Sequence, residues 1–258
     1  MALTTVWKRR ALLAGGALAV FGWVKGAPHL ASLGRPDFVF EDIPDLPPFR
    51  RLRGTGSATS GAAIFAGLDV GKPENEAGTE LKQMVRGDPC TAFFGRNQGD
   101  AVPIAMFSDF ACPICRIMDD RLAELEESDA GTFYIVRHQL PILGAASETA
   151  SRAVLAADLQ GAYRDMHARL IRSPAVTDER YIAAIADDLG LDQDRLLADM
   201  RSDAIDRRLR MTAAIADVFG FFGTPAFAIG RTVFMGSVPT NTLRQLVTLE
   251  ANKPCLSA

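Results

Sequence analysis

The sequence predicts an α/β protein in which a run of helices interrupts a sheet. Two observations lead to this prediction. Short apolar runs typical of buried strands occur near residues 101–108 and again near residues 226–235. Between them, residues 147–219 show the apolar spacing of amphipathic helices. Strands on both sides of a helical stretch favour one sheet with a helical insertion in its middle.

The first half of the fold is expected to begin near Glu76, where apolar runs and amphipathic stretches start to alternate. Thr91–Phe94 is a candidate short strand. Ala101–Ser108 is nearly continuous in apolar residues, as a strand buried on both faces should be. Pro113–Glu127 follows helical spacing, and Thr132–Arg137 returns to strand character.

The helical block that follows carries three apolar stripes, and residues that end helices separate its parts. The expected breaks fall near Gly161, Ser173-Pro174 and Gly190. Ala226–Ile229 and Thr232–Met235 are then expected to be two short strands that meet at Gly230-Arg231. Thr240–Leu249 is expected to be the closing helix.

Composition excludes one large class of function. The 258 residues carry a formal net charge of −3, and the arginines are scattered along the helical segments. A nucleic-acid-binding protein presents a basic stripe, and this sequence has none. Four cysteines are too few for the core to depend on them, so their positions carry more information than their number.

Residues 1–26 have the pattern of an export signal. Lys8, Arg9 and Arg10 precede an apolar run from Ala11 to Val24, which has signal-peptide length and is short for a bilayer span. The paired arginines fit a twin-arginine signal as well as an ordinary secretory one. We therefore expect an exported, periplasmic protein, with an uncleaved membrane anchor or a buried N-terminal helix as the alternatives.

Residues 27–75 are expected to form an extended tether. Prolines come first, and a stretch of small residues follows at residues 54–61, so the segment has little to bury. Residues 76–258 are then the folded domain, with the helical insertion at about residues 145–219.

The sequence Cys112-Pro113-Ile114-Cys115 lies where a predicted buried strand gives way to a helix. A cysteine in the first helical turn faces unpaired backbone N–H groups and the positive end of the helix dipole, and both favour the thiolate. Pro113 suits this position because it lacks an N–H and already has a helical φ. We expect an exposed, activated nucleophile at Cys112 and a shielded resolving partner at Cys115.

A C-x-x-C pair alone is also typical of half a zinc site or of a local structural disulfide. A zinc site needs a second ligand pair at suitable spacing, but Cys90 and Cys255 are isolated, and His138 and His167 each stand alone. The strand-to-helix setting therefore favours a redox pair, which calls for no metal and no organic cofactor.

Taken together, these features resemble the thioredoxin superfamily and, within it, the DsbA-like thiol:disulfide oxidoreductases. Cys112–Cys115 resembles the active site, and Tyr134–Gly144 resembles the strand that leads into the helical domain. The helical block resembles the insertion that separates DsbA-like proteins from plain thioredoxin. Gly223–Gly230, with the sequence GTPAFAIG, resembles the cis-proline loop. The resemblance covers about residues 78–250.

The resemblance implies a cis peptide bond before Pro225, opposite Cys112. It also implies that the backbone of Thr224 pairs with an extended substrate segment and that the Thr224 hydroxyl touches the Cys112 sulfur. In the family, the dipeptide between the cysteines, here Pro113 and Ile114, tunes the redox potential together with the residue before the cis proline.

The implied function is oxidation of cysteine pairs in other exported proteins, with reoxidation by a membrane DsbB-like quinone reductase. A periplasmic disulfide reductase or isomerase, kept reduced by a membrane donor, uses the same dithiol chemistry. Thr224 is more typical of those relatives, because strong oxidases tend to have valine there. The chain also has Phe110 where many relatives carry Trp or Tyr. Direction therefore stays open.

Two alternatives come from other classes. A non-catalytic chaperone or binding module would keep the fold without the chemistry. A glutathione-linked isomerase of this fold does not require two cysteines, so the intact Cys112 and Cys115 pair counts against it.

Three further groups have structural interpretations. Cys90 and Cys255 flank the predicted domain, and we expect a second, structural disulfide between them, with two free thiols as the alternative. His138 is expected to be a packed structural histidine and not a proton shuttle. Asp109 is expected to cap or solvate its loop and not to transfer protons.

Overall fold

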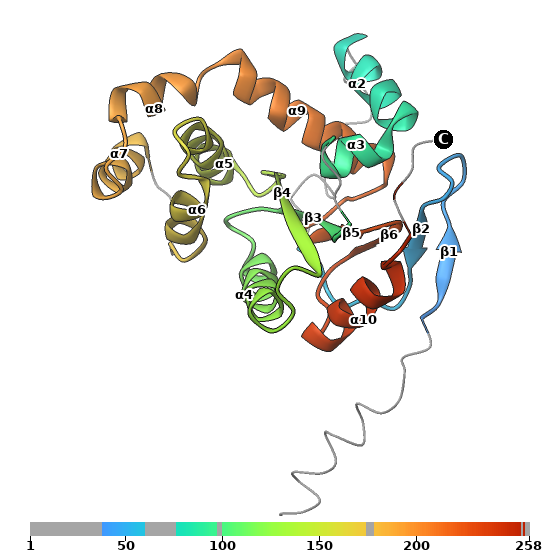
Figure 1. Cartoon of the computed structure of the whole chain (residues 1–258). Coiled ribbons are helices and arrows are strands. Elements are labelled where there is room, and N and C mark those ends of the chain that lie inside the picture. Colours follow the sequence, from blue (N-terminus) through green and yellow to red (C-terminus); the bar gives the residue numbers. More distant parts are fainter. Residues whose placement is uncertain (1–37, 60–75, 97–99, 174–177, 254, 256–258) are drawn as a thin grey trace, which may run out of the picture. The chain divides into compact units, whose positions relative to one another are not determined.

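The computed structural model describes residues 38–59, 76–96, 100–173, 178–253 and 255 (Figure 1). The predicted export signal at residues 1–26 lies outside these residues, as do residues 27–37 and 60–75 of the predicted tether. Val39–Ala258 forms one structural unit, which holds the sheet and the helices.

The described part of the chain contains a six-stranded sheet in the order β1-β2-β6-β5-β3-β4, where β1 spans Phe40–Asp42 and β2 spans Arg50–Leu52. β3 (Val102–Ser108) is parallel to β4 (Phe133–Gln139) on one side and antiparallel to β5 (Ala226–Ile229) on the other. β6 (Thr232–Met235) pairs antiparallel with β5. Every residue of β3 except Pro103 is buried, which explains its nearly continuous apolar sequence.

Helices cover both faces of this sheet. α4 (Pro113–Ser128) follows β3 and contacts α10 (Thr240–Glu250). α2 (Glu76–Gly87) and α3 (Pro89–Phe94) contact α9 (Asp203–Val218), and α3 also contacts β3. Figure 1 shows α4 and α10 on one side of the sheet and α2 and α3 on the other.

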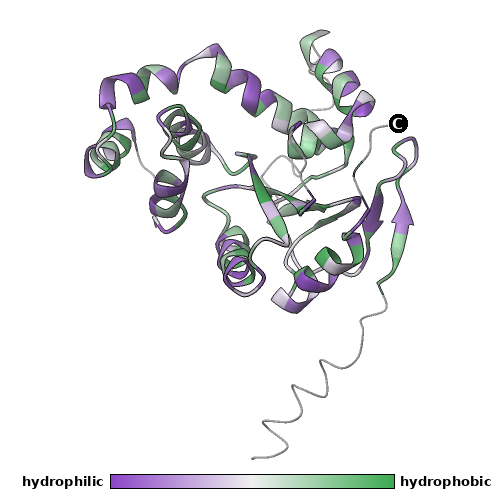
Figure 2. Ribbon diagram, in the orientation of Figure 1, coloured by the Kyte–Doolittle hydropathy of each residue, from purple (hydrophilic) through white to green (hydrophobic). Residues whose placement is uncertain are grey.

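The predicted helical insertion is confirmed, and it lies between β4 and β5. Its helices before α9 are α5 (Ala145–Asp158), α6 (Tyr163–Ile171), α7 (Glu179–Asp188) and α8 (Gln193–Asp199). These helices bury their own apolar cluster, separate from the one beside the sheet. In Figure 2 the helices carry both hydrophilic and hydrophobic segments, as helices with one buried face should.

The cluster beside the sheet is rich in phenylalanine. Phe93 from α3 lies with its ring centroid 4.5 Å from that of Phe219 and 5.8 Å from that of Phe107 in β3. Phe49 also packs on Phe93 and Phe219. Residues far apart in the sequence therefore meet around one side chain of α3, which places this helix against the sheet.

The prediction of a strand at Thr91–Phe94 is wrong, because these residues belong to α3. The Asp88 carboxylate accepts a hydrogen bond from the Thr91 N–H at 3.0 Å, and Pro89 stands at the first helical position. A capping side chain followed by proline starts a helix, and here this local signal outweighs the strand propensity of two adjacent phenylalanines.

The prediction of a tether is wrong for residues 38–59. β1 (Phe40–Asp42) and β2 (Arg50–Leu52) form an antiparallel pair, and β2 runs parallel to β6. The prolines of this segment stand in the turns between the two strands, so they interrupt no ladder. The Arg50 guanidinium reaches the buried Glu250 carboxylate at 2.7 Å, which attaches β2 to α10.

The helical regions also differ from the prediction in two places. α2 was not anticipated, although the fold was expected to begin near its first residue. A break at residues 200–202 separates α8 from α9, where Ser202 caps α9 by accepting the Ile205 N–H. No helix in the described part of the chain has the length and apolar character to cross a membrane.

Cys90 and Cys255 form a disulfide, with their Cα atoms 5.6 Å apart. Cys90 lies in α3, and Cys255 follows α10. Both belong to the same buried cluster as Phe93, so the bond ties the end of the chain to the phenylalanine core.

Removing both sulfurs with Cys90→Ala and Cys255→Ala is expected to lower the free energy of unfolding by about 2–5 kcal/mol. The bond spans 165 residues, and a crosslink over that length strongly restricts the unfolded chain. Urea titration of both proteins followed by circular dichroism measures the difference. A change below about 1 kcal/mol would contradict a structural role for this bond.

Candidate active site

The cysteine pair stands where β3 gives way to α4. Cys112 is the N-cap of α4, and Pro113 follows at the first helical position. The Cys112 sulfur accepts a hydrogen bond from the Cys115 N–H at 3.2 Å, and no disulfide joins the two residues. The helix therefore begins with one of its first N–H groups directed at the Cys112 sulfur, as the sequence predicts.

Asp109 fixes the loop that carries Cys112. Its carboxylate is fully buried and accepts four hydrogen bonds. The donors are the Ala111 N–H at 2.8 Å, the Ser147 hydroxyl at 2.6 Å, and the N–H groups of Ile142 and Leu143 at 2.8 and 2.9 Å. Asp109 therefore caps its loop, as expected, but its carboxylate is buried and not solvated. Asp109 ties the thiol loop to the entrance of α5.

The proline loop before β5 lies against the thiol pair. The peptide bond between Thr224 and Pro225 is cis, and the Cys112 thiol donates to the Thr224 carbonyl oxygen at 3.4 Å. The Thr224 hydroxyl is buried and has no hydrogen-bonding partner within the described residues. It lowers the pKa of both thiols, because it can donate to a sulfur that ionises.

The two sulfurs differ strongly in acidity. The pKa of Cys112 is lowered to about 6, first by the hydrogen bond from the Cys115 thiol. Burial opposes this shift, hydrogen bonds from Thr59 and the Cys115 N–H add to it, and the nearby Thr224 hydroxyl lowers the pKa as well. Burial raises the pKa of Cys115, and the neighbouring Cys112 raises it further. The structure therefore holds one thiol ready to ionise beside another that stays protonated.

One expectation about this site is wrong: Cys112 is not exposed. Both sulfur-bearing side chains have zero solvent exposure. The Thr59 side chain hydrogen-bonds the Cys112 sulfur. Thr59 belongs to the segment expected to be a tether, and nothing in its composition indicates a return to the active site. Sequence reasoning therefore missed both Thr59 and the shielding.

Two exposed apolar side chains lie close in sequence to the proline loop and to the cysteine pair. Phe222, just before the proline loop, is 63% exposed, and Ile117 in α4 is 49% exposed. Pro113 is exposed and Ile114 is partly exposed. The phenylalanines at 219 and 221, by contrast, are part of the core.

His138 has a structural place, as expected. Its ring stacks on Phe107 at a centroid distance of 4.5 Å, and its Nε2 atom lies 2.8 Å from the Phe93 carbonyl oxygen. Burial lowers the pKa of His138 to about 4, so the ring is neutral near pH 7. No hydrogen bond of the described residues links it to either site cysteine.

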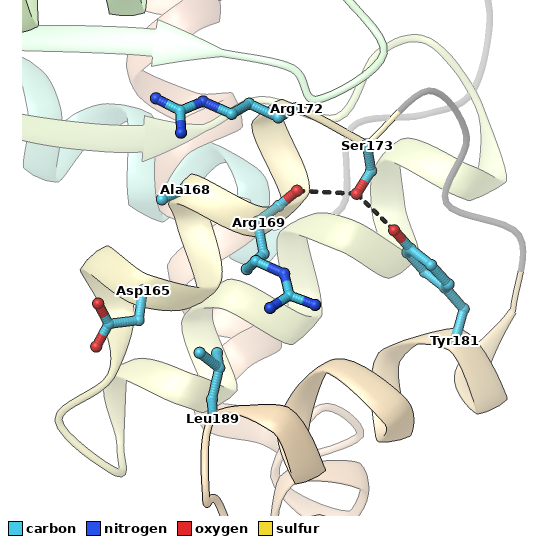
Figure 3. Close-up of a pocket in the computed structure, with 7 residues that line it drawn as sticks. All are labelled: Asp165, Ala168, Arg169, Arg172, Ser173, Tyr181 and Leu189. Carbon is cyan, nitrogen blue, oxygen red and sulfur yellow. Dashed lines mark hydrogen bonds between the residues drawn. The ribbon is translucent and has the colours of Figure 1, made fainter.

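The helical insertion has a hollow of its own, drawn in Figure 3. The Ser173 hydroxyl bonds the Arg169 carbonyl at 2.8 Å and lies 2.7 Å from the Tyr181 hydroxyl. None of the residues predicted to carry the chemistry lines it. Its lining residues are Asp165, Ala168, Arg169, Arg172, Ser173, Tyr181 and Leu189.

Among the described residues, no group of three or more His, Cys, Asp or Glu is placed to hold a metal ion.

Comparison with known proteins agrees with this geometry. A thioredoxin-like oxidoreductase from Silicibacter pomeroyi DSS-3 has 30% sequence identity and a TM-score of 0.57, over 62% of this chain and 96% of that one. The thiol-disulfide exchange protein alpha-DsbA2 from Wolbachia pipientis shares the fold, with 23% identity and a TM-score of 0.58, over 68% of this chain and 98% of that one.

A curated relative is Na(+)/H(+) antiporter NhaA 1 from Salinispora arenicola, which is 27% identical over 215 residues. The match takes in 81% of this chain but only 30% of the antiporter, so this chain spans less than a third of that relative's length. The family model for the DSBA-like thioredoxin domain matches residues 103–248, which include both site cysteines and the proline loop. The chain belongs to the DsbA-like thioredoxin family.

Proposed function

We propose that this chain is exported and oxidises cysteine pairs in other exported proteins, with Cys112 as the nucleophile and Cys115 as its resolving partner. The observation that carries the proposal is the difference in acidity between two adjacent thiols at the start of α4. The pKa of Cys112 is lowered to about 6, while that of Cys115 is raised. Such a pair supports directional exchange, because one sulfur forms the mixed disulfide and the other resolves it.

The proposed cycle begins with the Cys112–Cys115 disulfide. A substrate thiolate attacks the Cys112 sulfur, the bond to Cys115 breaks, and the Cys115 sulfur takes up a proton. The second substrate thiolate then attacks the substrate sulfur of the mixed disulfide and releases Cys112 as a thiolate. Two substrate thiols have lost two electrons in total, and the chain holds them as its dithiol.

The oxidising direction follows from the same acidity. A thiolate that is stabilised in the dithiol form makes the disulfide form a stronger oxidant, by about 1.4 kcal/mol for each unit by which the pKa falls. The alternative is a disulfide reductase or isomerase with the same dithiol chemistry, and Thr224 before the cis proline favours it by resemblance. A chaperone or binding module of the same fold is the alternative without chemistry.

Export is supported by two features. The basic residues and apolar run of residues 1–26 have the form of a signal or an N-terminal anchor. The Cys90–Cys255 disulfide persists in oxidising compartments such as the periplasm. An oxidase in that compartment needs a membrane redox partner, of the DsbB-like quinone reductase kind, to remake its disulfide. A reductase or isomerase needs a membrane donor of electrons instead.

Exchange chemistry is tested by catalysis of insulin disulfide reduction with dithiothreitol. Cys112→Ser is expected to abolish the activity. Among the described residues the one other free cysteine is Cys115, and burial keeps its thiol protonated. Cys115→Ser is expected to stop turnover and to accumulate mixed disulfides at Cys112. The Cys90→Ala, Cys255→Ala protein is the matched control and keeps its activity. Full activity of Cys112→Ser would exclude the proposal and leave the chaperone alternative.

Acidity is tested by following thiolate absorbance of the reduced protein against pH. We expect a midpoint near pH 6 for Cys112. Cys115→Ala is expected to raise this pKa by about 1–2 units, since a hydrogen bond to a charged group is worth about 1.5–3 kcal/mol. Cys115→Ser keeps a donor and is the matched control. A midpoint near the ordinary cysteine value of about 8.5 would contradict the site electrostatics.

Direction is tested by the reduction potential of the Cys112–Cys115 pair in glutathione buffers, with the two redox forms separated by mass. We expect a value closer to about −120 mV, typical of a strong oxidase, than to about −270 mV, typical of thioredoxin. A value near the lower figure would support the reductase alternative and leave the exchange chemistry intact.

A further inference from the structure

The chain's own residues occupy the edge of the proline loop beside Cys112. The Thr59 N–H donates to the Thr224 carbonyl oxygen at 2.6 Å, and the Thr224 N–H donates to the Thr59 carbonyl oxygen at 2.8 Å. The two residues thus form an antiparallel bridge. Both main-chain groups of Thr224 that an extended peptide would use are therefore already paired.

The strap, defined here as Thr55–Thr59, continues along the loop after β6. The Gly56 N–H donates to the Ser237 carbonyl oxygen at 3.0 Å, and the Ser237 N–H donates to the Ser57 carbonyl oxygen at 3.2 Å. A Cβ atom on Gly236 would lie 2.0 Å from the Gly56 oxygen. This approach of two backbones requires a glycine, so the strap fits a surface shaped to receive an extended chain.

Main-chain hydrogen bonds hold the strap, and apolar burial contributes little. Gly56 and Ser57 are exposed, and the other strap residues are only partly buried. By contrast, Leu52 in β2, which two residues separate from the strap, is 6% exposed and belongs to the buried core. A solvent-accessible segment of this kind opens at low cost, because water replaces each hydrogen bond that is lost.

The strap also explains why Cys112 is hidden. The Thr59 side chain hydrogen-bonds the Cys112 sulfur, whose side chain has zero exposure. A residue in the place of Thr59 thus presents its side chain to the Cys112 sulfur while its backbone pairs with Thr224. These are the two contacts that a cysteine of an extended substrate needs in order to exchange with Cys112.

We propose that the strap is an internal competitor of substrate: an extended, cysteine-containing segment must displace Thr55–Thr59 from Thr224 before its thiolate reaches Cys112. This inference rests on the proposed function, since it takes the proline loop as the substrate edge. It assigns to Thr59 the position of the reacting substrate residue. Folded proteins, which cannot offer an extended segment, are excluded as substrates while the strap stays bound.

Displacement is tested by the rate at which iodoacetamide alkylates Cys112 in the reduced protein at pH 8, where this thiol is ionised. A methyl group on Gly56 would meet the Ser237 carbonyl oxygen at 2.7 Å, so Gly56→Ala pushes the strap away. We expect its rate to exceed that of wild type by roughly tenfold or more. Gly87→Ala is the matched control, because its Cβ meets nothing within 4 Å, and its rate should equal that of wild type.

Equal rates for Gly56→Ala and wild type would overturn the inference, even if Cys112→Ser had already shown that the pair is catalytic. Loss of insulin reduction is the readout for the proposed function, and protection from alkylation is the readout for the strap. The two failures are therefore distinguishable.

The position of Thr59 beside the Cys112 sulfur is tested separately. This test does not require that the Gly56→Ala variant folds normally. In the oxidised protein, the thiol introduced by Thr59→Cys attacks the Cys112 sulfur. The Cys112–Cys115 bond breaks, a bond between positions 59 and 112 forms, and Cys115 takes up the proton. Peptide mapping is expected to find this new disulfide in most of the protein. Ser57→Cys, on an exposed residue of the same strap, should leave Cys112 bonded to Cys115. The same result for both variants would overturn the inference.

Discussion

The antiparallel pairing of β3 with β5 is the constraint on which the active site depends. Its register sets Phe107 opposite Ala226, so the end of β3 and the start of β5 lie side by side. The thiol loop leaves from one strand and the proline loop enters the other. Both strands are buried on both faces, and a slip of one residue would reverse every side chain. Core packing therefore brings Cys112, five residues after Phe107, to Thr224, two residues before Ala226.

Burial and hydrogen bonding act against each other at the two sulfurs, and their balance differs between them. Burial disfavours a thiolate at either position. At Cys112 the donors converge, from the Cys115 thiol, the helix N–H and Thr59, and they prevail. At Cys115 burial prevails. The same helix start thus lowers the pKa of one thiol and leaves the pKa of another, three residues on, raised. The reason is that only the N-cap position faces the unpaired N–H groups.

Much of this site could be predicted because its signals are local. A proline after Cys112 marks the start of a helix, and the apolar runs of β3, β5 and β6 mark buried strands. The errors at residues 38–59 fell where distant residues decide the structure, whereas the error at Thr91–Phe94 came from a local helix cap. β1 and β2 are three residues each, and β2 takes its place in the sheet from pairing with β6, while β1 pairs with β2. The place of Thr59 is set by its contact with Thr224. The composition of residues 38–59 indicates neither pairing, because these residues include prolines and small residues typical of a linker.

The strap and the substrate use the same hydrogen bonds, and this makes their exchange inexpensive. When a substrate segment replaces Thr59, the N–H and carbonyl of Thr224 gain new partners, and the buried loop is never left unsatisfied. The strap's own groups pass to water. The net free-energy cost of displacing the strap is then the difference between two similar sets of backbone hydrogen bonds. A folded protein has no unpaired strand that could replace the strap. The Cys112 sulfur is shielded in this way, and only a chain that can take the strap's place in the ladder reaches it.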